Sequence, residues 1–286
     1  MNKQLTLSLI IPAYNEEHYI RSCLDAVAAQ TRMPDEVIIV DNNSTDNTAR
    51  VAREYEFVRV VREKRQGRGH ARSRGFDEAS SDIIGRIDVD TVLAPNWCER
   101  VLDDFAAGGI DGLTGLGQVA ILPRIQWPKS VLWTWMYTLW AAVFSGFDMM
   151  WGANMAITQR AWQKVRDDVC NDDRQVHEDQ DISLCILARG MRIRRDNALL
   201  MHTDGQTFHY FPKLVYYTWL RVNTIRRHRM SGDYARIQRT YPWTYRLPLI
   251  IISPLLFVPF FVVSLLFWPV DVLIRNISRT IFRSTG

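Results

Sequence analysis

Hydrophobic residues follow two different periods along the first hundred residues. Short runs rich in β-branched residues, each ending in polar residues, are typical of buried strands, here over residues 5–14, 35–43, 57–63 and 82–88. Between them, apolar residues recur at helical spacing or follow clusters of capping residues, which predicts helices over 15–30, 44–55 and 69–81. Strands that alternate with helices in this way predict an α/β fold with a parallel sheet covered by helices.

The pattern becomes less regular after Trp97. A glycine-containing strand is predicted over 112–119, an amphipathic helix from Gln159 and a late strand over 191–200. Residues 176–190 begin with acidic residues and continue as a helix, and residues 216–239 form a strongly basic helical stretch. Residues 130–144 are apolar all round and rich in tryptophan, which fits either a helix buried on the sheet or a helix at a membrane surface.

The end of the chain contains an apolar segment. From Leu249 to Val270 there are 22 positions without a charged residue, and as a helix they would extend about 33 Å, enough to cross the hydrocarbon core of a bilayer. Four prolines would kink such a helix: Pro248, Pro254, Pro259 and Pro269. We expect a single kinked span or, preferably, a re-entrant hairpin with both ends on one side. The other interpretation is a helix buried in the domain.

Composition narrows the choice of function. The 286 residues carry a net charge of +4, which is too small to favour a nucleic-acid partner, and 47% of them are hydrophobic, so a large core is expected. The four cysteines form no CxxC pair, which argues against a zinc site and indicates scattered buried thiols in a reducing compartment. The apolar run Leu7–Ile11 is too short for a signal peptide.

Two aspartates, Asp88 and Asp90, stand at the end of the fourth predicted strand. Residues two apart on a strand point to the same side, so their carboxylates can converge on one Mg²⁺ or Mn²⁺ ion. A metal held by so few protein ligands commonly also binds substrate phosphates. The alternative is an acidic turn in solvent.

Neighbouring motifs favour the first interpretation. The carboxyl ends of parallel strands share one edge of the sheet, where ligands bind in open α/β sheets. The sequence therefore places four more polar side chains beside the aspartates, namely Tyr14, Glu16, Asp41 and Ser44. A glycine-containing loop adds arginines, which suit phosphate: Arg65, Arg68, Arg72 and Arg74. Together these residues predict a site for a nucleoside diphosphate.

Five motifs in order carry a resemblance to a known family. They read "IIPAYNEE", "VIIVDNNSTDNT", "GHARSRGFDEASSDIIGRIDVDT", "WGANMAIT" and "HEDQDIS". The set resembles the family 2 inverting glycosyltransferases with the GT-A fold, over residues 5–190. The resemblance implies a nucleotide-sugar donor and a DXD motif at Asp88–Asp90, in which Asp88 contacts the nucleotide and Asp90 binds the metal. It places further nucleotide-sugar contacts at Pro12, Tyr14, Glu16, Asp41 and Arg72.

The same resemblance assigns the catalytic base to the pair Glu178–Asp179. A single displacement needs one carboxylate to take the proton of the acceptor hydroxyl. We expect Asp179 in this role, with Asp181 as the near alternative. The alternative to a catalytic role is that these acids are simply the acidic first turn of a helix, stabilised by the helix dipole.

Further features of the sequence define the predicted activity more closely. The QxxRW motif of the processive branch of the family is missing, so transfer of one sugar is expected. His202 and His209 are each candidates for a place near the metal or the diphosphate.

The competing hypotheses are a nucleotidyltransferase, which would normally show a glycine-rich first loop with a lysine, and a non-catalytic member that binds lipid or a partner protein.

The predicted organisation has four parts. A glycosyltransferase domain covers 1–215, with a nucleotide-binding half up to about residue 95 and an acceptor half from 96. It is followed by a basic juxtamembrane region (216–246), an apolar membrane segment (247–274) and a basic tail (275–286). Nucleotide sugars are mostly cytosolic, so we expect the catalytic domain at the cytoplasmic side of the cell membrane, with a lipid-linked or membrane-proximal acceptor.

Overall fold

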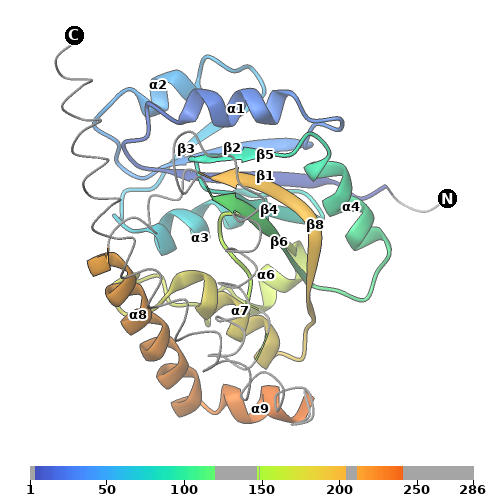
Figure 1. Ribbon diagram of the computed structural model, residues 1–286, viewed down its shortest axis with the longest axis vertical. Helices are drawn as coiled ribbons and strands as arrows, with labels where there is room; N and C mark the ends of the chain where they lie inside the picture. The colour runs from blue at the N-terminus through green and yellow to red at the C-terminus, as the bar shows by residue number, and fades with distance from the viewer. Residues whose placement is uncertain (1–3, 120–146, 148, 204–210, 241–286) are drawn as a thin grey trace.

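A single eight-stranded sheet forms the centre of the molecule (Figure 1). The computed structural model describes residues 4–119, 147, 149–203 and 211–240. The order of the strands is β3-β2-β1-β4-β7-β6-β8-β5. Their bounds are β1 Leu7–Ala13, β2 Glu36–Asp41, β3 Val58–Arg62, β4 Ile83–Arg86, β5 Thr91–Leu93, β6 Gly112–Val119, β7 Met155–Thr158 and β8 Ile193–Thr203.

The four strands of the first half are parallel. β1 lies between β2 and β4, and β3 pairs with β2. Successive side chains of a strand point to opposite faces, and in β1 both faces are buried. Leu7, Leu9 and Ile11 pack in one hydrophobic cluster and Ile10 packs in another. Burial on both faces explains why these strands are nearly continuous apolar runs.

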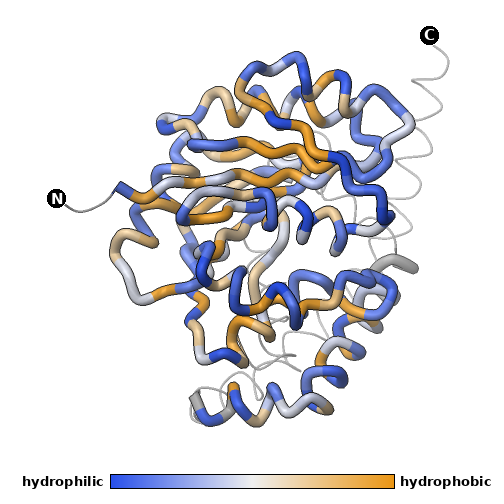
Figure 2. The backbone as a smooth tube through the Cα atoms, turned by 180° about the vertical axis from the view of Figure 1, so that it is seen from behind, coloured by the Kyte–Doolittle hydropathy of each residue, from blue (hydrophilic) through white to orange (hydrophobic). Residues whose placement is uncertain are grey.

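Helices cover both faces of the sheet. The cluster around Leu9 is closed by α1 (Ile20–Ala28), α2 (Thr48–Ala52) and α4 (Trp97–Ala106). The cluster around Ile10 is closed by α3 (Arg68–Glu78), α6 (Gln159–Val165) and α7 (Glu178–Ala188). Figure 2 shows hydrophobic central strands that run into hydrophilic loops at one end.

The last two helices of the described residues pack on α7. α8 (Phe211–Met230) and α9 (Asp233–Thr240) contribute Ile225, Tyr234 and Ile237 to a third hydrophobic cluster with Leu184 of α7. Because α8 begins at Phe211, the predicted domain boundary at residue 215 falls inside this helix. The chain turns between the two helices at Gly232, whose φ of +81° favours glycine.

The sequence pattern predicted most of these elements. The four parallel strands, the strand 112–119 and the helices around α1, α3, α6 and α7 are confirmed within a few residues. The antiparallel strands β5 and β7 were not predicted, because three or four residues give too little periodicity to recognise.

The predicted membrane segment (247–274) and the tryptophan-rich segment (130–144) lie outside the described residues. Among the helices that the structure describes, none combines the length and the apolar character that crossing a bilayer requires.

Candidate active site

The carboxyl ends of β1 and β2 bring the first predicted site residues together. Ala13 pairs with Asp41 across the two strands, so Tyr14 and Asp41 stand at the same edge of the sheet. The Tyr14 side chain is exposed, Pro12 is half-buried, and Asp41 is buried and accepts a hydrogen bond from the Ser44 backbone N–H at 3.0 Å. At this edge, the Tyr14 side chain is therefore accessible to a ligand, while the Asp41 side chain is held in place by its hydrogen bond.

The loops that follow these strands are bonded to one another. The backbone N–H of Asn15 donates to Ser44 Oγ at 3.1 Å, and Asn15 Oδ1 accepts from the backbone N–H of Thr45 at 2.8 Å. The N–H of Glu16 donates to Thr48 Oγ1 at 2.8 Å. Asn15 has a φ of +55°, a left-handed conformation that asparagine tolerates. These hydrogen bonds fix the positions of the two loops relative to each other at this edge.

Three carboxylates meet at this edge. Burial, together with the negative charges of Asp90 and Asp88, raises the pKa of Glu16 to about 7. Glu16 therefore lies close to both aspartates of the DXD motif. Asp90 is half-buried and the side chain of Asp88 is 45% exposed, so both can be reached from solvent. A group of carboxylates that lie close together and open to solvent fits a divalent cation.

Arg86, in β4, joins the DXD motif to the ED motif. Its Nη2 donates to Asp88 Oδ1 at 3.0 Å, and its Nη1 donates to Asp179 Oδ1 at 2.5 Å. The two nitrogens also contact both carboxylate oxygens of Glu178, at 2.9 and 3.1 Å. The Arg86 side chain is buried, so its positive charge needs anionic partners close by. The three carboxylates provide this compensating negative charge. The two predicted motifs, far apart in sequence, thus form one site.

Asp179 is held from two sides. Oδ1 accepts from Arg86, and Oδ2 accepts from the backbone N–H of Gly152 at 2.9 Å. Burial raises the pKa of Asp179, but the Arg86 charge and hydrogen bonds lower it more, and the resulting pKa lies below the usual range. Asp179 is therefore ionised at neutral pH and can accept a proton.

Glu178 and Arg72 lie beneath the site. The Arg72 side chain is 0% exposed. Its Nη1 donates to the Glu178 carbonyl at 2.8 Å and to Glu178 Oε2 at 3.2 Å, and its Nη2 contacts Asn171 Oδ1 at 3.3 Å. This position favours support of the Glu178 carboxylate by Arg72 rather than the direct nucleotide contact that the family resemblance predicts.

The other arginines of the predicted phosphate loop take different positions. Arg65 pairs with Glu63, and Arg74 pairs with Glu78 one helical turn along α3. Arg68 is half-exposed, its Nη1 donates to Tyr217 Oη of α8 at 2.9 Å, and its charge interacts with Glu178 and Asp179. Of these three, Arg68 is placed nearest to the paired carboxylates.

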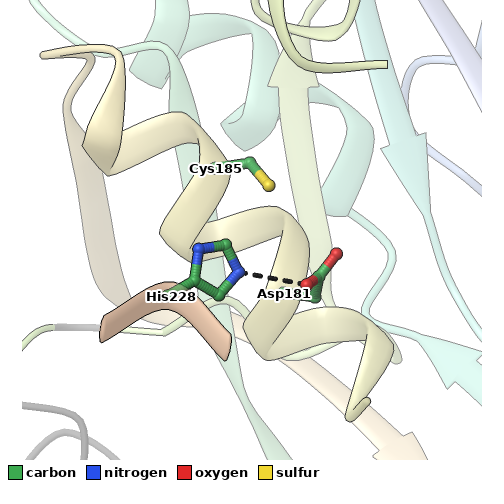
Figure 3. A group of neighbouring side chains, drawn as sticks. All are labelled: Asp181, Cys185 and His228. Carbon is green, nitrogen blue, oxygen red and sulfur yellow. Dashed lines mark hydrogen bonds and ion pairs between the residues drawn. The ribbon is translucent and has the colours of Figure 1, made fainter. Parts of the chain in front are cut away.

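Asp181, the alternative base, belongs to a separate buried cluster (Figure 3). It lies with Cys185 and His228 within 4.8 Å, close enough for three ligands of one metal ion. However, His228 Nε2 contacts Asp181 Oδ1 at 3.0 Å and His228 Nδ1 contacts Asp233 Oδ2 at 2.7 Å. Burial lowers the pKa of His228, but the two carboxylates raise it more, so the pKa lies above the usual value.

This cluster is an ion-paired contact between helices. An imidazolium that donates from both nitrogens has no lone pair left for a metal. Burial also raises the pKa of the Cys185 thiol, with a further increase from the Asp181 charge, so the sulfur stays protonated. Asp181 is itself 0% exposed. It therefore fixes α7 to α8 and α9 and is not accessible to an acceptor.

Sequence reasoning missed two residues of the site, Arg86 and Gly152. An arginine inside the apolar run "IIGRID" is a signal, because a buried guanidinium requires carboxylate partners. Gly152 gave no such signal, since its role depends on a backbone N–H that meets Asp179 across the fold. Of the predicted histidines, His202 is exposed on β8 opposite Val92, and His209 lies outside the described residues.

Comparison with known proteins identifies the class of this protein. Residues 8–166 match the family model for glycosyl transferase family 2, which is more than half of the 286 residues. The chain belongs to glycosyl transferase family 2.

Two relatives show the extent of the sequence similarity. Glycosyltransferase AglE of Haloferax volcanii is 34% identical over 116 residues, which are 38% of this chain and 38% of AglE. The 4,4'-diaponeurosporenoate glycosyltransferase of Staphylococcus aureus is 34% identical over 149 residues, 50% of this chain and 40% of the relative. The matched regions span less than half the length of these curated relatives.

A solved structure shares the fold. The mannosyltransferase PcManGT from Pyrobaculum calidifontis, in complex with GDP-Man and Mn²⁺, has a TM-score of 0.63 and 17% identity, and covers 88% of this chain and 74% of that one. The predicted α/β GT-A-like fold, with a mostly parallel sheet flanked by helices, is confirmed.

Proposed function

We propose that this protein is a metal-dependent inverting glycosyltransferase that moves one sugar from a nucleotide diphosphate sugar to a hydroxyl or phosphate acceptor. The observation that carries the proposal is the position of Arg86, which contacts both Asp88 of the DXD motif and Asp179 of the ED motif. This contact places a candidate metal and nucleotide site beside a candidate base.

The reaction needs one proton transfer and one displacement. Asp179, ionised and held by Arg86 and Gly152, takes the proton of an acceptor hydroxyl as the oxygen attacks the anomeric carbon. The new C–O bond forms as the bond from that carbon to the diphosphate oxygen breaks, and the diphosphate leaves with the electron pair. Attack opposite the leaving group inverts the anomeric centre, and no covalent glycosyl-enzyme is formed.

The donor is expected at the edge of the sheet formed by β1, β2 and β4. Exposed Tyr14 can stack on the base, while Pro12 and Asp41 border the nucleoside and Asp88 faces the nucleotide. Asp90 and Asp88, with Glu16 beside them, would hold Mg²⁺ or Mn²⁺, since the charges of the two aspartates already raise the pKa of Glu16. When bound, the ion offsets charge on the departing diphosphate. PcManGT, a neighbour in fold, binds GDP-Man and Mn²⁺, which supports this assignment.

The acceptor is proposed to be lipid-linked or membrane-proximal, and the catalytic domain to lie on the cytoplasmic side of the cell membrane. Two sequence features support this location: the uncharged run Leu249–Val270 and the arginines on either side of it.

Substitution of Asp179 by asparagine tests the proposal. Asparagine keeps the size of the side chain but cannot take a proton, so transfer should fall by at least about 100-fold. Release of nucleoside diphosphate from a panel of nucleotide sugars measures transfer, and nucleotide binding, measured by calorimetry, should persist.

Asp167→Asn serves as the matched control, because that side chain is 91% exposed and its ion-pair partner is the neighbouring Arg166. It should leave transfer unchanged. Normal turnover by the Asp179→Asn variant would refute the assignment of the base.

A further inference from the structure

One side of α8 is exposed and carries an unusual set of residues for a surface in water. Tyr216, Trp219 and Val222 are 43%, 53% and 48% exposed, and the rings of Tyr216 and Trp219 stack with their centroids 6.2 Å apart. Arg226 and Arg229 continue the same line toward the end of the helix and are exposed as well. Spacings of three and four residues place all five on one side of a helix.

The opposite side of α8 contacts the segment that carries the paired carboxylates. Thr224 Oγ1 accepts from the backbone N–H of His177 at 2.8 Å, directly before Glu178. His228 contacts Asp181 at 3.0 Å in the first turn of α7. Tyr217 accepts from Arg68, whose charge interacts with Glu178. A single helix therefore separates the exposed aromatic residues from the candidate active site (Figure 1).

We propose that this side of α8 docks on the surface of an anionic lipid bilayer, and so presents the candidate active site to an acceptor at the membrane. Aromatic rings favour the interfacial region of a bilayer, and arginines complement anionic headgroups. In the sequence, only eight residues separate the end of α9 at Thr240 from the uncharged run that begins at Leu249, which supports a membrane as the partner of this surface. The choice of acceptor rests on the proposed function; the docking does not.

A fluorophore placed on α8 tests the contact directly in the full-length chain. Three of the four cysteines are buried and Cys170 is half-buried, so a Cys170→Ser background allows selective labelling. An environment-sensitive fluorophore is attached at Val222→Cys, or at Arg53→Cys, an exposed position directly after α2, as the matched control. The protein is reconstituted in phosphatidylcholine vesicles with or without phosphatidylglycerol, each containing a nitroxide-labelled lipid as quencher.

We expect strong quenching at position 222 in the vesicles that contain phosphatidylglycerol, weaker quenching in phosphatidylcholine alone, and none at position 53. High salt should reduce the quenching at 222, because it screens the arginines. A label at 222 that is shielded from water yet not quenched would mean that protein covers this side of α8. That result, or a label that stays in water in both vesicles, would overturn the proposal.

Kinetic measurements distinguish a failure of the docking surface from a failure of the proposed function. Trp219→Ser changes an exposed side chain, so folding should be unaffected, while the KM for a lipid-linked acceptor should rise about tenfold, as expected for the loss of part of an indole contact. Nucleotide binding should not change. If the wild-type protein shows no sugar transfer but position 222 is still quenched by lipid, the proposed function fails and the docking surface stands.

Discussion

At the residue scale, Arg86 determines the arrangement of the candidate site. A buried guanidinium that loses its carboxylate partners is strongly unfavourable, and removal of one partner of a buried pair typically costs about 3–5 kcal/mol. Arg86 contacts Asp88, Glu178 and Asp179 at once, so stability of the core and geometry of the site depend on the same contacts. This coupling explains why a buried charge is tolerated at the end of β4.

Gly152 offers a test of that geometry without removal of a charge. A Cβ at position 152 would lie 2.3 Å from both Arg86 Nη1 and Asp179 Oδ1. Both side chains belong to the buried ion pair, so the shift that Gly152→Ala forces should cost about 1–3 kcal/mol of stability, and displacement of Asp179 should lower kcat about 100-fold. Urea unfolding and sugar-transfer assays on the same preparation measure the two effects.

Gly112→Ala is the matched control for this substitution. Its Cβ would meet Met150 Sδ at 3.0 Å and Ile193 Cγ1 at 3.1 Å, away from the carboxylates. We expect a similar change in stability with activity kept. Equal loss of kcat in both variants would contradict the role given to Gly152.

At the element scale, the position of α7 depends on α8 and α9. His228 lies between Asp181 of α7 and Asp233 of α9, Ser231 Oγ donates to Asp233 at 2.6 Å, and Arg227 approaches Asp181 at 3.9 Å. Cys185 borders the same cluster and stays protonated. Since the first turn of α7 carries Asp179, this contact between helices also positions the candidate base.

The pH dependence of stability tests this contact. Because the pKa of His228 is higher in the folded than in the unfolded protein, its stabilising contribution is complete below the unfolded value of about 6.5 and is lost as pH rises through the folded value. The low pKa of Asp233 keeps the acceptor ionised at that pH; burial opposes this shift, and hydrogen bonds from Ser231 and His228 produce it. The free energy of unfolding should therefore decrease from about pH 6.5 upward.

His228→Gln should remove this pH dependence and lower stability by about 3 kcal/mol near pH 6. His18→Gln, at an exposed histidine of the loop before α1, is the control and should behave like the wild type. The interpretation would fail if urea unfolding gave the same pH profile for the wild type and for His228→Gln.

At the scale of the whole molecule, the two halves meet at one edge of the sheet. The parallel strands β1, β2 and β4 supply the predicted nucleotide and metal residues, and α7, after β7, supplies the candidate base. Hydrogen bonds join the loops of the first half to one another at the edge where we propose that the donor binds. A ligand that binds there should stabilise the folded protein as a whole.

Thermal unfolding with nucleoside diphosphates measures this effect. UDP or GDP with Mn²⁺ should raise the melting temperature, and at a ligand concentration of 100 times Kd the stabilisation is about 2.7 kcal/mol. The shift should shrink without Mn²⁺ and in Asp90→Asn. Asp103→Asn, at an exposed position of α4, is the control and should keep the full shift. An equal shift with and without Mn²⁺ would contradict a metal site at Asp90.

The sequence by itself determined the strands and helices of the first half and the edge on which Asp41, Asp88 and Asp90 gather. Apolar periodicity is a local property, and parallel strands bring their carboxyl ends to one edge whatever the rest of the chain does. Asp179 followed from the resemblance to a family, on motifs that the chain carries in order.

Only the tertiary structure decided which charges pair. Arg72 and Arg86 meet Glu178 across more than ninety residues, and His228 meets Asp181 from another helix. Burial then separates acids that look alike in sequence: Asp179 remains at the site, while Asp181, two residues on, is enclosed by α8 and α9. Such pairings depend on how helices pack against the sheet, and neither spacing nor composition along the chain records that packing.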